Sequence, residues 1–393
     1  MTVKAAIITP TLSHFEVPMF RLASTLSGLD VRVLHTDLRD NAFYDKDYGR
    51  VIDWGEALRS GYPNTGYASM PEVATAVFDW SPDVVLQYGY FWRGALPLFA
   101  RMRMRRIPVV HRGLLTPYKN TRHNPLITNT WRAVQPHLLR RFQGHHYGGS
   151  YSEGVLKAAG IPKEQRFFVP YSIDTPYFAA RADAAEEIEN AEQLKKVLGW
   201  AEDAPVVLFM CQQSWFKAPD VMLRVVAEAQ KSLPNLKLLM AGSGQMTDEL
   251  KAYAEAHLLA GSFHFPGYVS SKQTMPYYLA ADLVMFPSRY DTWSRGVNEA
   301  MLARRPCIVS RIVPAAGGLV EDGENGYVVD GLEPEAFAAR VLEFFRRPEG
   351  ERKKMGQAAR ARAETFSYEA HADDLRRSFM DVVGAHSMMS EAR

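Results

Sequence analysis

The sequence predicts an α/β protein built from two doubly wound parallel sheets. The chain has 393 residues, which is too long for one ordinary core and suits two domains of about 150–200 residues each. Hydrophobic residues make up 47% of the chain and charged residues 23%, as in ordinary globular proteins. Short runs rich in Val, Ile and Leu alternate with helical patterns throughout. This alternation is typical of parallel strands that helices cover on both faces.

The predicted strands form two groups, one in each half of the chain. The first group is VKAAIIT (3–9), DVRVLHT (30–36), DVVLQYG (83–89) and IPVVHRG (107–113). The second is APVVLFM (204–210), LKLLMAG (236–242), SFHFPGY (262–268), ADLVMFPS (281–288) and PCIVSR (306–311). A turn-rich stretch and a charged helix within 171–205 join the groups, and amphipathic helices over 335–383 end the chain. We therefore expect an N-terminal domain over 1–178, a C-terminal domain over 179–365, and a helical segment, 366–393, that packs back on the first domain.

Charge and targeting signals limit the class of protein. Residues 1–175 carry 21 basic and 14 acidic side chains, whereas the remainder carries 25 and 30. The basic half is densest at RMRMRR (101–106), which is either a solvated helix face or a contact for anionic lipid or an anionic acceptor. The two cysteines cannot form a disulfide framework, and no apolar run is long enough for a secretory signal or a membrane span. We expect a soluble cytoplasmic protein, peripheral on the inner face of the membrane if the basic half binds lipid, without a nucleic acid partner.

The stretch PSRYDTWSRGVNEAM (287–301) carries two acids, Asp291 and Glu299, between a predicted strand and a predicted helix. In open α/β sheets, ligands bind beyond the carboxyl ends of strands, where helix N-termini point. Backbone N–H groups from Ser294 to Asn298 are expected to be available to phosphate oxygens, with Glu299 in the first helical turn. A carboxylate there can accept hydrogen bonds from the vicinal hydroxyls of a ribose. Favourable pairing of Glu299 with the helix dipole is the alternative explanation.

Two other strand ends carry weaker signals. Gly242-Ser243-Gly244 follows the strand LKLLMAG, and an ordinary tight turn explains a lone Gly-x-Gly as well as a phosphate loop does. Lys217 lies between the strand APVVLFM and the next helix, but surface lysines are common. Neither feature identifies a site without further context.

The segment 206–330 resembles the C-terminal domain of the family-4 glycosyltransferases, which have the two-lobed GT-B fold. The family carries a Glu-x7-Glu motif, and DTWSRGVNEAM matches its Trp293, Val297, Asn298, Glu299, Ala300 and Met301 positions. The flanking PYYLAADLVMFPS, the following RRPCIVSR and the Gly-x-Asn-Gly turn at 323–326 agree as well. Residues 1–175 match more loosely, through TPTLSHFEVPMF, PVVHRG and VPYSIDTPYF.

The resemblance implies a hexosyltransferase that uses a nucleotide-sugar donor. It implies that the Rossmann-like N-terminal domain, 1–178, binds the acceptor and that the Rossmann-like C-terminal domain, 179–365, binds the donor. It implies that Glu299 holds the ribose, that Asp291 lies by the transferring sugar, and that Lys217 neutralises the diphosphate. His111 would reach the sugar from the other lobe, although a structural histidine is the alternative. The donor-binding positions carried over are Gln212, Ser294, Arg295, Gly296, Val297 and Val269, the last through the backbone of 267–269 that would border the base.

The sequence departs from the family pattern at several of these positions. The first acid is Asp291 instead of Glu, and the arginine that usually precedes Lys217 is Gln212. Ser294-Arg295 stands where Gly-Leu is usual, and Leu12-Ser13-His14 replaces the Gly-Gly of the first strand loop. Because the site has lost one cation at Gln212, we expect Arg295 to replace it, with a solvent-facing arginine as the alternative.

The resemblance also implies retention of anomeric configuration, without a metal cofactor. No second carboxylate pairs with Asp291, so front-face attack fits better than covalent double displacement, which needs two carboxylates ~5–5.5 Å apart. Lys217 and helix N-termini would stabilise the leaving group. The acceptor is a hydroxyl on a glycan, a lipid-linked glycan or a small molecule, as in bacterial polysaccharide or glycoconjugate synthesis. The alternatives are a metal-dependent transferase using Asp45-Lys46-Asp47, a sugar-nucleotide epimerase, and a two-lobed sugar-binding protein.

Overall fold

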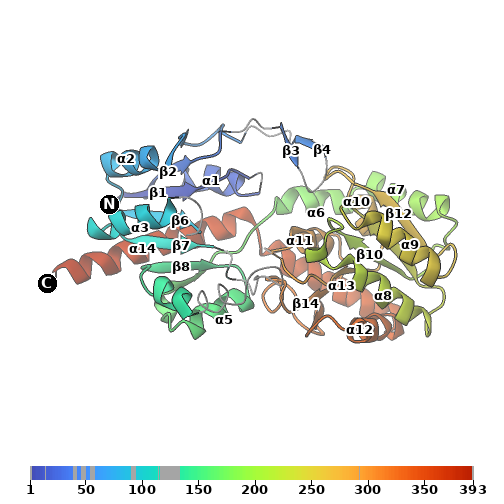
Figure 1. The fold of residues 1–393 in the computed structure, drawn as a ribbon. Helices are drawn as coiled ribbons and strands as arrows, with labels where there is room; N and C mark the ends of the chain where they lie inside the picture. The colour runs from blue at the N-terminus through green and yellow to red at the C-terminus, as the bar shows by residue number, and fades with distance from the viewer. Residues whose placement is uncertain are drawn as a thin grey trace. The chain divides into compact units, whose positions relative to one another are not determined.

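The chain forms two compact units in a computed structural model (Figure 1). Unit 1 comprises Met1–Tyr44, Val51–Tyr171 and Tyr368–Arg393, and unit 2 comprises Asp45–Arg50 and Ser172–Ser367. The predicted boundaries at 178 and 365 lie close to the unit boundaries at 171 and 367. The structure describes residues 2–13, 15–38, 42–45, 50–53, 58–89, 94–113, 115, 133–291 and 293–391.

Unit 1 is built on a seven-stranded parallel sheet with the order β5-β2-β1-β6-β7-β8-β9. The chain order reverses between β1 and β6, so this is a topological switch point. The strands are β1 (Val3–Thr9), β2 (Leu29–His35), β5 (Asn64–Gly66), β6 (Val84–Tyr88), β7 (Val109–Arg112), β8 (Gly144–Tyr147) and β9 (Arg166–Phe168). A separate two-stranded sheet pairs β3 (Ala42–Asp45) with β4 (Arg50–Asp53).

Helices cover both faces of the unit 1 sheet. Successive side chains along a strand point to opposite faces, and in this sheet both sets are apolar. Ala5 and Ile7 point to a core shared with α1 and α14, whereas Ala6 and Ile8 point to a core shared with α2, α3 and α5. The last helix, α14, packs against α1, β1, β6 and β9, although it follows unit 2 in the chain (Figure 1). The helices are α1 (Val17–Ala23), α2 (Met70–Trp80), α3 (Ala95–Met104), α5 (Ser150–Ala158), the 3-10 helix η1 (Lys163–Gln165) and α14 (Tyr368–Glu391).

Unit 2 holds a six-stranded parallel sheet with the order β12-β11-β10-β13-β14-β15. Its switch point lies between β10 and β13, which is where an open α/β sheet binds ligands. The strands are β10 (Val206–Met210), β11 (Lys237–Ala241), β12 (Phe263–Gly267), β13 (Leu283–Phe286), β14 (Cys307–Ser310) and β15 (Gly326–Val329).

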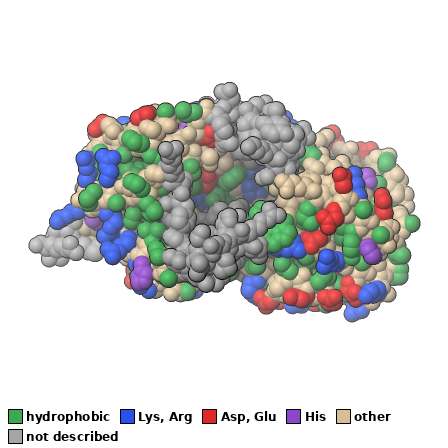
Figure 2. Space-filling model, in the orientation of Figure 1, with side chains coloured by type: hydrophobic (Ala, Val, Ile, Leu, Met, Phe, Trp, Pro, Cys, Tyr) green, Lys and Arg blue, Asp and Glu red, His purple; other side chains and the backbone are tan. Residues whose placement is uncertain are grey.

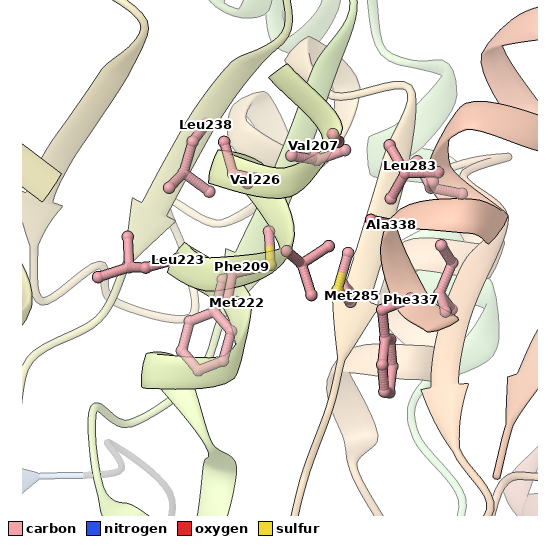
Figure 3. Close-up of a cluster of buried hydrophobic side chains, with 14 of the residues drawn as sticks. Val207, Phe209, Met222, Leu223, Val226, Leu238, Leu283, Met285, Phe337 and Ala338 are labelled. Atoms are coloured by element: carbon pink, nitrogen blue, oxygen red, sulfur yellow. The ribbon is translucent and has the colours of Figure 1, made fainter. Parts of the chain in front are cut away.

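The main core of unit 2 lies between this sheet and helices α8, α9 and α12 (Figure 3). Val207 and Phe209 of β10 meet Met222 and Val226 of α8 there, and Phe337 joins them from α12. All five side chains are fully buried, so the sheet is a rigid support for the loops at its carboxyl edge. The helices are α6 (Thr175–Asp183), α7 (Ala185–Val197), the 3-10 helix η2 (Trp215–Lys217), α8 (Pro219–Gln230), α9 (Thr247–His257), α10 (Met275–Ala280), α11 (Arg295–Leu302), α12 (Pro334–Arg346) and α13 (Glu349–Glu364).

The predicted fold class of two doubly wound parallel α/β sheets is confirmed. Each strand predicted from an apolar run is present within a residue or two. Strands β5, β8 and β9 were not predicted because Asn-Thr-Gly, Gly-His-His-Tyr and Arg-Phe-Phe contain no apolar run of strand length. Strands β3, β4 and β15 were not predicted either. In the described part of the chain, none of the helices combines the length and the apolarity needed to cross a bilayer.

Unit 1 buries several histidines in their neutral form. Burial lowers the pKa of His145 on β8 and of His371 on α14 to about 4 in each case. It also lowers the pKa of His146, whose Nε2 lies 2.8 Å from the Ser378 hydroxyl and so joins β8 to α14. In the unfolded chain, these rings regain a pKa near 6.5 and bind protons below it. The unfolded state is therefore favoured progressively as the pH falls from about 6.5 toward 4.

We predict that unit 1 loses stability in mild acid through these rings. Each ring with a folded pKa near 4 should lower the unfolding free energy by about 2 kcal/mol between pH 7.5 and pH 5. Replacing one of them, His371→Phe, should reduce the acid-induced loss of unfolding free energy by about that amount. Hydrogen exchange of the β8 amides measures this free energy. The exposed His137→Phe is the control. An unchanged pH dependence in His371→Phe would contradict the assignment.

Candidate active site

Two loops at the switch point of unit 2 are joined through one carbonyl group. The Phe216 carbonyl oxygen, in the loop after β10, accepts hydrogen bonds from the backbone N–H groups of Arg289 (2.8 Å) and Tyr290 (3.1 Å) in the loop after β13. The Arg289 guanidinium adds a bidentate ion pair with Asp220 at 2.7 and 2.6 Å. Because β10 and β13 are neighbours, residues 74 positions apart in the sequence meet at this edge.

Lys217 and Asp291 form an ion pair where these loops meet. The Lys217 Nζ lies 2.6 Å from Asp291 Oδ2, which also accepts hydrogen bonds from the hydroxyls of Ser288 (3.1 Å) and Ser294 (2.6 Å). The backbone N–H of Trp293 donates to Oδ1 at 3.2 Å. Burial alone would raise the pKa of Asp291, but the charge and hydrogen bond of Lys217 lower it below its usual value. Asp291 is only 1% exposed, whereas the Lys217 side chain is 24% exposed. The carboxylate therefore fixes the ammonium group of a lysine side chain that stays partly exposed.

Glu299 lies one turn further into helix α11 than the sequence predicted. The helix begins at Arg295, after Ser294 in a left-handed conformation (φ 62°), so Glu299 is its fifth residue instead of a first-turn residue. The helix dipole acts mainly on the first turn, and dipole pairing therefore explains Glu299 poorly. Its carboxylate accepts a hydrogen bond from the Tyr278 hydroxyl at 3.1 Å and lies 3.7 Å from the Arg295 guanidinium. Burial raises the pKa of Glu299, and Arg295 and Tyr278 partly oppose that shift.

The Gly-x-Gly turn after β11 is explained by close backbone packing. A Cβ atom on Gly242 would stand 1.9 Å from the Cys211 carbonyl oxygen, and one on Gly244 would stand 2.4 Å from that of Gln213. The fully buried Gln213 stabilises the turn. Its side-chain oxygen accepts a hydrogen bond from the Thr247 hydroxyl at 2.6 Å, and that hydroxyl accepts one from the backbone N–H of Gly244 at 3.0 Å. Gln212, the residue predicted to face the donor, is partly buried beside it. The two glycines thus let the loops after β10 and β11 touch.

A pocket of about 480 Å³ lies beside Val269, after the edge strand β12. Arg181 fixes its rim, because its guanidinium donates to the carbonyl groups of Ser271 (3.3 Å) and Lys272 (2.8 Å) and pairs with Glu187. The remaining lining residues come from α7, β12, the loop after β12 and the start of α10: Glu186, Asn190, Pro266, Tyr268, Gln273, Pro276 and Tyr277. The pocket is therefore a polar depression with aromatic walls at the same edge of the sheet as Lys217 and Glu299.

His111 lies in unit 1, apart from the other predicted site residues, which all belong to unit 2. It is fully buried in β7, with ring centroids of Phe142 and His145 at 5.1 and 5.5 Å. Burial, with a smaller contribution from His145, lowers the pKa of His111 well below its usual value. Gly113 makes room for the ring, since a Cβ atom there would stand 2.5 Å from His111 Nε2. A neutral imidazole is the result.

Sequence reasoning missed a polar cluster at the switch point of unit 1. Glu16, after β1, accepts a hydrogen bond from Ser13 (3.2 Å), and its Oε1 lies 3.8 Å from Nε of Arg112. The guanidinium of Arg112 lies over the ring of Tyr171 at 4.7 Å, and burial raises the pKa of Glu16. The sequence signal was limited to two charged residues, Glu16 just before α1 and Arg112 at the end of β7. The partners of Asp291, Ser288 and Ser294, were missed for the same reason, because serines in loops carry no distinctive pattern.

Metal ligation has no obvious location in the part of the chain that the structure describes, where no group of three His, Cys, Asp or Glu side chains could hold an ion. The Asp45-Lys46-Asp47 alternative falls largely outside the described residues, which include the backbone of Asp45 but neither Lys46 nor Asp47.

Known proteins match both the C-terminal half of the sequence and the fold. Residues 190–362 match the family described as "Glycosyl transferases group 1". This segment is therefore similar to group 1 glycosyltransferase domains. It contains β10–β15 and therefore Lys217, Asp291 and Glu299.

The curated relatives resemble about half of the chain. The D-inositol 3-phosphate glycosyltransferase of Segniliparus rotundus is 31% identical over 218 residues, which are 54% of this chain and 46% of that protein. The enzyme of the same name from Corynebacterium diphtheriae is 31% identical over 202 residues, 49% of this chain and 46% of that protein. The chain thus spans about half the length of the curated relatives that it matches.

Solved glycosyltransferase structures share the whole fold at low sequence identity. Anabaena Alr3699/HepE in complex with UDP superposes with a TM-score of 0.71 at 17% identity, covering 96% of this chain and 99% of that one. Sucrose-phosphate synthase from Thermosynechococcus elongatus gives a TM-score of 0.68 at 16% identity, covering 98% of this chain and 100% of that one. The two parallel α/β sheets therefore have the GT-B fold, and this likeness covers unit 1 as well as the segment that matches the family.

Proposed function

We propose that the protein is a glycosyltransferase that moves a hexosyl group from a nucleotide-sugar donor to a hydroxyl acceptor. The observation that carries this proposal is the buried Asp291, which holds the ammonium of the partly exposed Lys217 side chain at the switch point of the unit 2 sheet. Donor diphosphates need a fixed positive charge as they leave, and a preorganised cation costs no reorganisation at that moment. The relatives named as D-inositol 3-phosphate glycosyltransferases, and the HepE structure with UDP, support a nucleotide-sugar donor.

The donor is assigned to the carboxyl edge of the unit 2 sheet. Its diphosphate would meet Lys217 and the backbone N–H groups of Ser294 and Gly296 at the start of α11. Val297, the third backbone position assigned to the donor, already donates its N–H to the Ser294 carbonyl oxygen at 2.8 Å. The donor ribose would meet Glu299, and the base would border Val269 at the pocket after β12. Gln212 lies next to the diphosphate in this arrangement.

Arg295 is proposed as the second cation for the diphosphate. It is the first residue of α11, and its guanidinium forms an ion pair with Glu299 at 3.7 Å, beside the helix start that would meet the diphosphate. A guanidinium can donate to two phosphate oxygens at once, which Lys cannot reproduce. The loss of the family arginine at Gln212 would be compensated from the opposite loop.

Front-face attack with retention of anomeric configuration fits the contacts of Asp291 better than double displacement does. A nucleophile needs a carboxylate oxygen that can reach the anomeric carbon, but Oδ2 of Asp291 already meets Lys217, Ser288 and Ser294. Asp291 is therefore proposed to position Lys217 near the transferring sugar, with no metal cofactor required. The leaving phosphate would take up the acceptor proton. The contact of His111 with the sugar stays a prediction from the resemblance, since the ring is neutral and fully buried in unit 1.

Unit 1 is proposed to take part in binding the acceptor, a hydroxyl on a glycan, a lipid-linked glycan or a small molecule, in bacterial polysaccharide or glycoconjugate synthesis. Exposed arginines on and after α3, namely Arg101, Arg103, Arg105 and Arg106, support peripheral contact with an anionic membrane. Figure 2 shows Lys and Arg side chains gathered on the face of unit 1 near α2 and α3. Met104 stands 76% exposed among them and could enter a lipid surface.

Glu299→Gln should weaken nucleoside diphosphate binding by about 10- to 100-fold. Loss of a charged hydrogen bond costs roughly 1.5–3 kcal/mol, which corresponds to one to two decades in Kd. Calorimetric titration with UDP, GDP and ADP near pH 8 keeps Glu299 ionised despite its raised pKa. Glu324→Gln, an exposed acid of the same unit, is the control. Equal affinity in Glu299→Gln and wild type would remove the ribose role.

The membrane proposal predicts salt-sensitive binding to anionic vesicles. Each basic residue near such a surface contributes about 1 kcal/mol and is screened within a Debye length. Sedimentation with phosphatidylglycerol vesicles should occur at low salt and fail at high salt. It should also fail when Arg101, Arg103, Arg105 and Arg106 are all replaced by Gln. Replacing Lys157 and Lys163, exposed on the same unit, should have little effect. No sedimentation of the wild type at low salt would favour a soluble acceptor.

A further inference from the structure

Three aromatic side chains stand beside the Lys217–Asp291 pair in the same two loops. Trp215 and Phe216 directly precede Lys217, and Tyr290 directly precedes Asp291. The ring centroids of Trp215 and Phe216 lie 5.6 Å apart, and those of Phe216 and Tyr290 lie 5.9 Å apart, both edge to face. Trp215 is 43% exposed and Phe216 is 39% exposed. We call Trp215, Phe216 and Tyr290 the aromatic rim.

The aromatic rim is held rigidly although its rings are not buried. The carbonyl oxygen of Phe216 accepts two backbone hydrogen bonds from the loop that carries Tyr290. Arg289, paired with Asp220, places its guanidinium 5.2 Å from the Trp215 ring centroid and donates to the Trp215 carbonyl oxygen at 3.1 Å. Large apolar side chains that are fixed by backbone and cation–π contacts, yet left in solvent, present a preformed contact surface.

We propose that the aromatic rim is the platform for a pyranose ring of the acceptor, so that the acceptor is a carbohydrate; this inference rests on the proposed function. The C–H bonds on one face of a pyranose make an apolar patch that packs on the face of an aromatic ring, while its hydroxyls need polar partners around the edge. Lys217, Arg289 and Asp220 supply such partners beside the rings, with side chains that are 24%, 19% and 22% exposed. A lipid chain would instead need a contiguous apolar surface without those charges.

The rim is assigned to the acceptor instead of the donor because of what each substrate brings to the site. The donor sugar is covalently attached to a diphosphate and a nucleoside, which provide binding contacts of their own. An acceptor depends on contacts to its own rings to be oriented, so a rigid stacking surface next to the reacting groups serves it most. The rim would then set which acceptors orient a hydroxyl productively.

The test is binding of the full-length protein, with UDP, GDP or ADP present, to an array of defined hexopyranose oligosaccharides. Wild type should be retained on a subset of glycans, and Trp215→Ala should bind those about tenfold more weakly. Trp215→Phe keeps a ring and should remain within about twofold of wild type. Leu259→Ala removes a side chain of similar exposure (48%) that lies just before β12, at the opposite edge of the sheet, and should bind as wild type does.

Separate readouts distinguish failure of the rim from failure of the proposed function. Nucleoside diphosphate affinity and melting temperature should be unchanged in Trp215→Ala, which shows that the donor site and the fold are intact. Glycan binding by Trp215→Ala equal to wild type, or retention of wild type on no glycan, would overturn the rim proposal. So would a loss of phosphatidylcholine vesicle binding in Trp215→Ala, which would identify a lipid as the occupant. Absence of nucleoside diphosphate binding in every variant, wild type included, would instead contradict the donor assignment.

Discussion

The candidate site depends on the ion pair between Lys217 and Asp291. A buried carboxylate is stable only when it is paired and hydrogen-bonded, and Asp291 receives an ammonium group, two hydroxyls and a backbone N–H. These contacts bind the loop after β10 to the loop after β13, so the same interaction that satisfies Asp291 also shapes the switch point. Removal of either partner would leave an uncompensated charge and disturb both loops.

The surrounding structure supplies the rigidity that this pair requires. The fully buried core under β10 and β13 keeps the strand ends in place, and the contact of Gly242 with the Cys211 carbonyl group brings the third loop against the first. The bidentate Arg289–Asp220 pair then fixes the outer side of the loops. Lys217 therefore presents its ammonium group from a fixed position, which is what electrostatic stabilisation of a leaving diphosphate needs.

Sequence patterns predicted the fold class and the central strands because parallel strands buried on both faces must be continuously apolar. They did not predict β8, Gly-His-His-Tyr, whose histidines are buried by partners distant in the sequence, such as Ser378 for His146. The motif loops were also predicted, but the pairing of Lys217 with Asp291 was not, because it follows from β10 and β13 being neighbours in space. Glu299 was placed a turn too early, since the left-handed Ser294 that delays the helix start leaves no sequence signal.

The most direct test of the account is the rate of nucleoside diphosphate release from a panel of nucleotide sugars and hydroxyl acceptors. It should be compared between wild type, Lys217→Gln, Asp291→Asn and the double variant. The account predicts release by wild type and a loss of about 100-fold or more in each single variant. It predicts no further loss in the double variant, because both residues act through one ammonium group. Two results would contradict it. One is a loss in the double variant equal to the product of the two single losses, and the other is no release of nucleoside diphosphate by wild type with any donor.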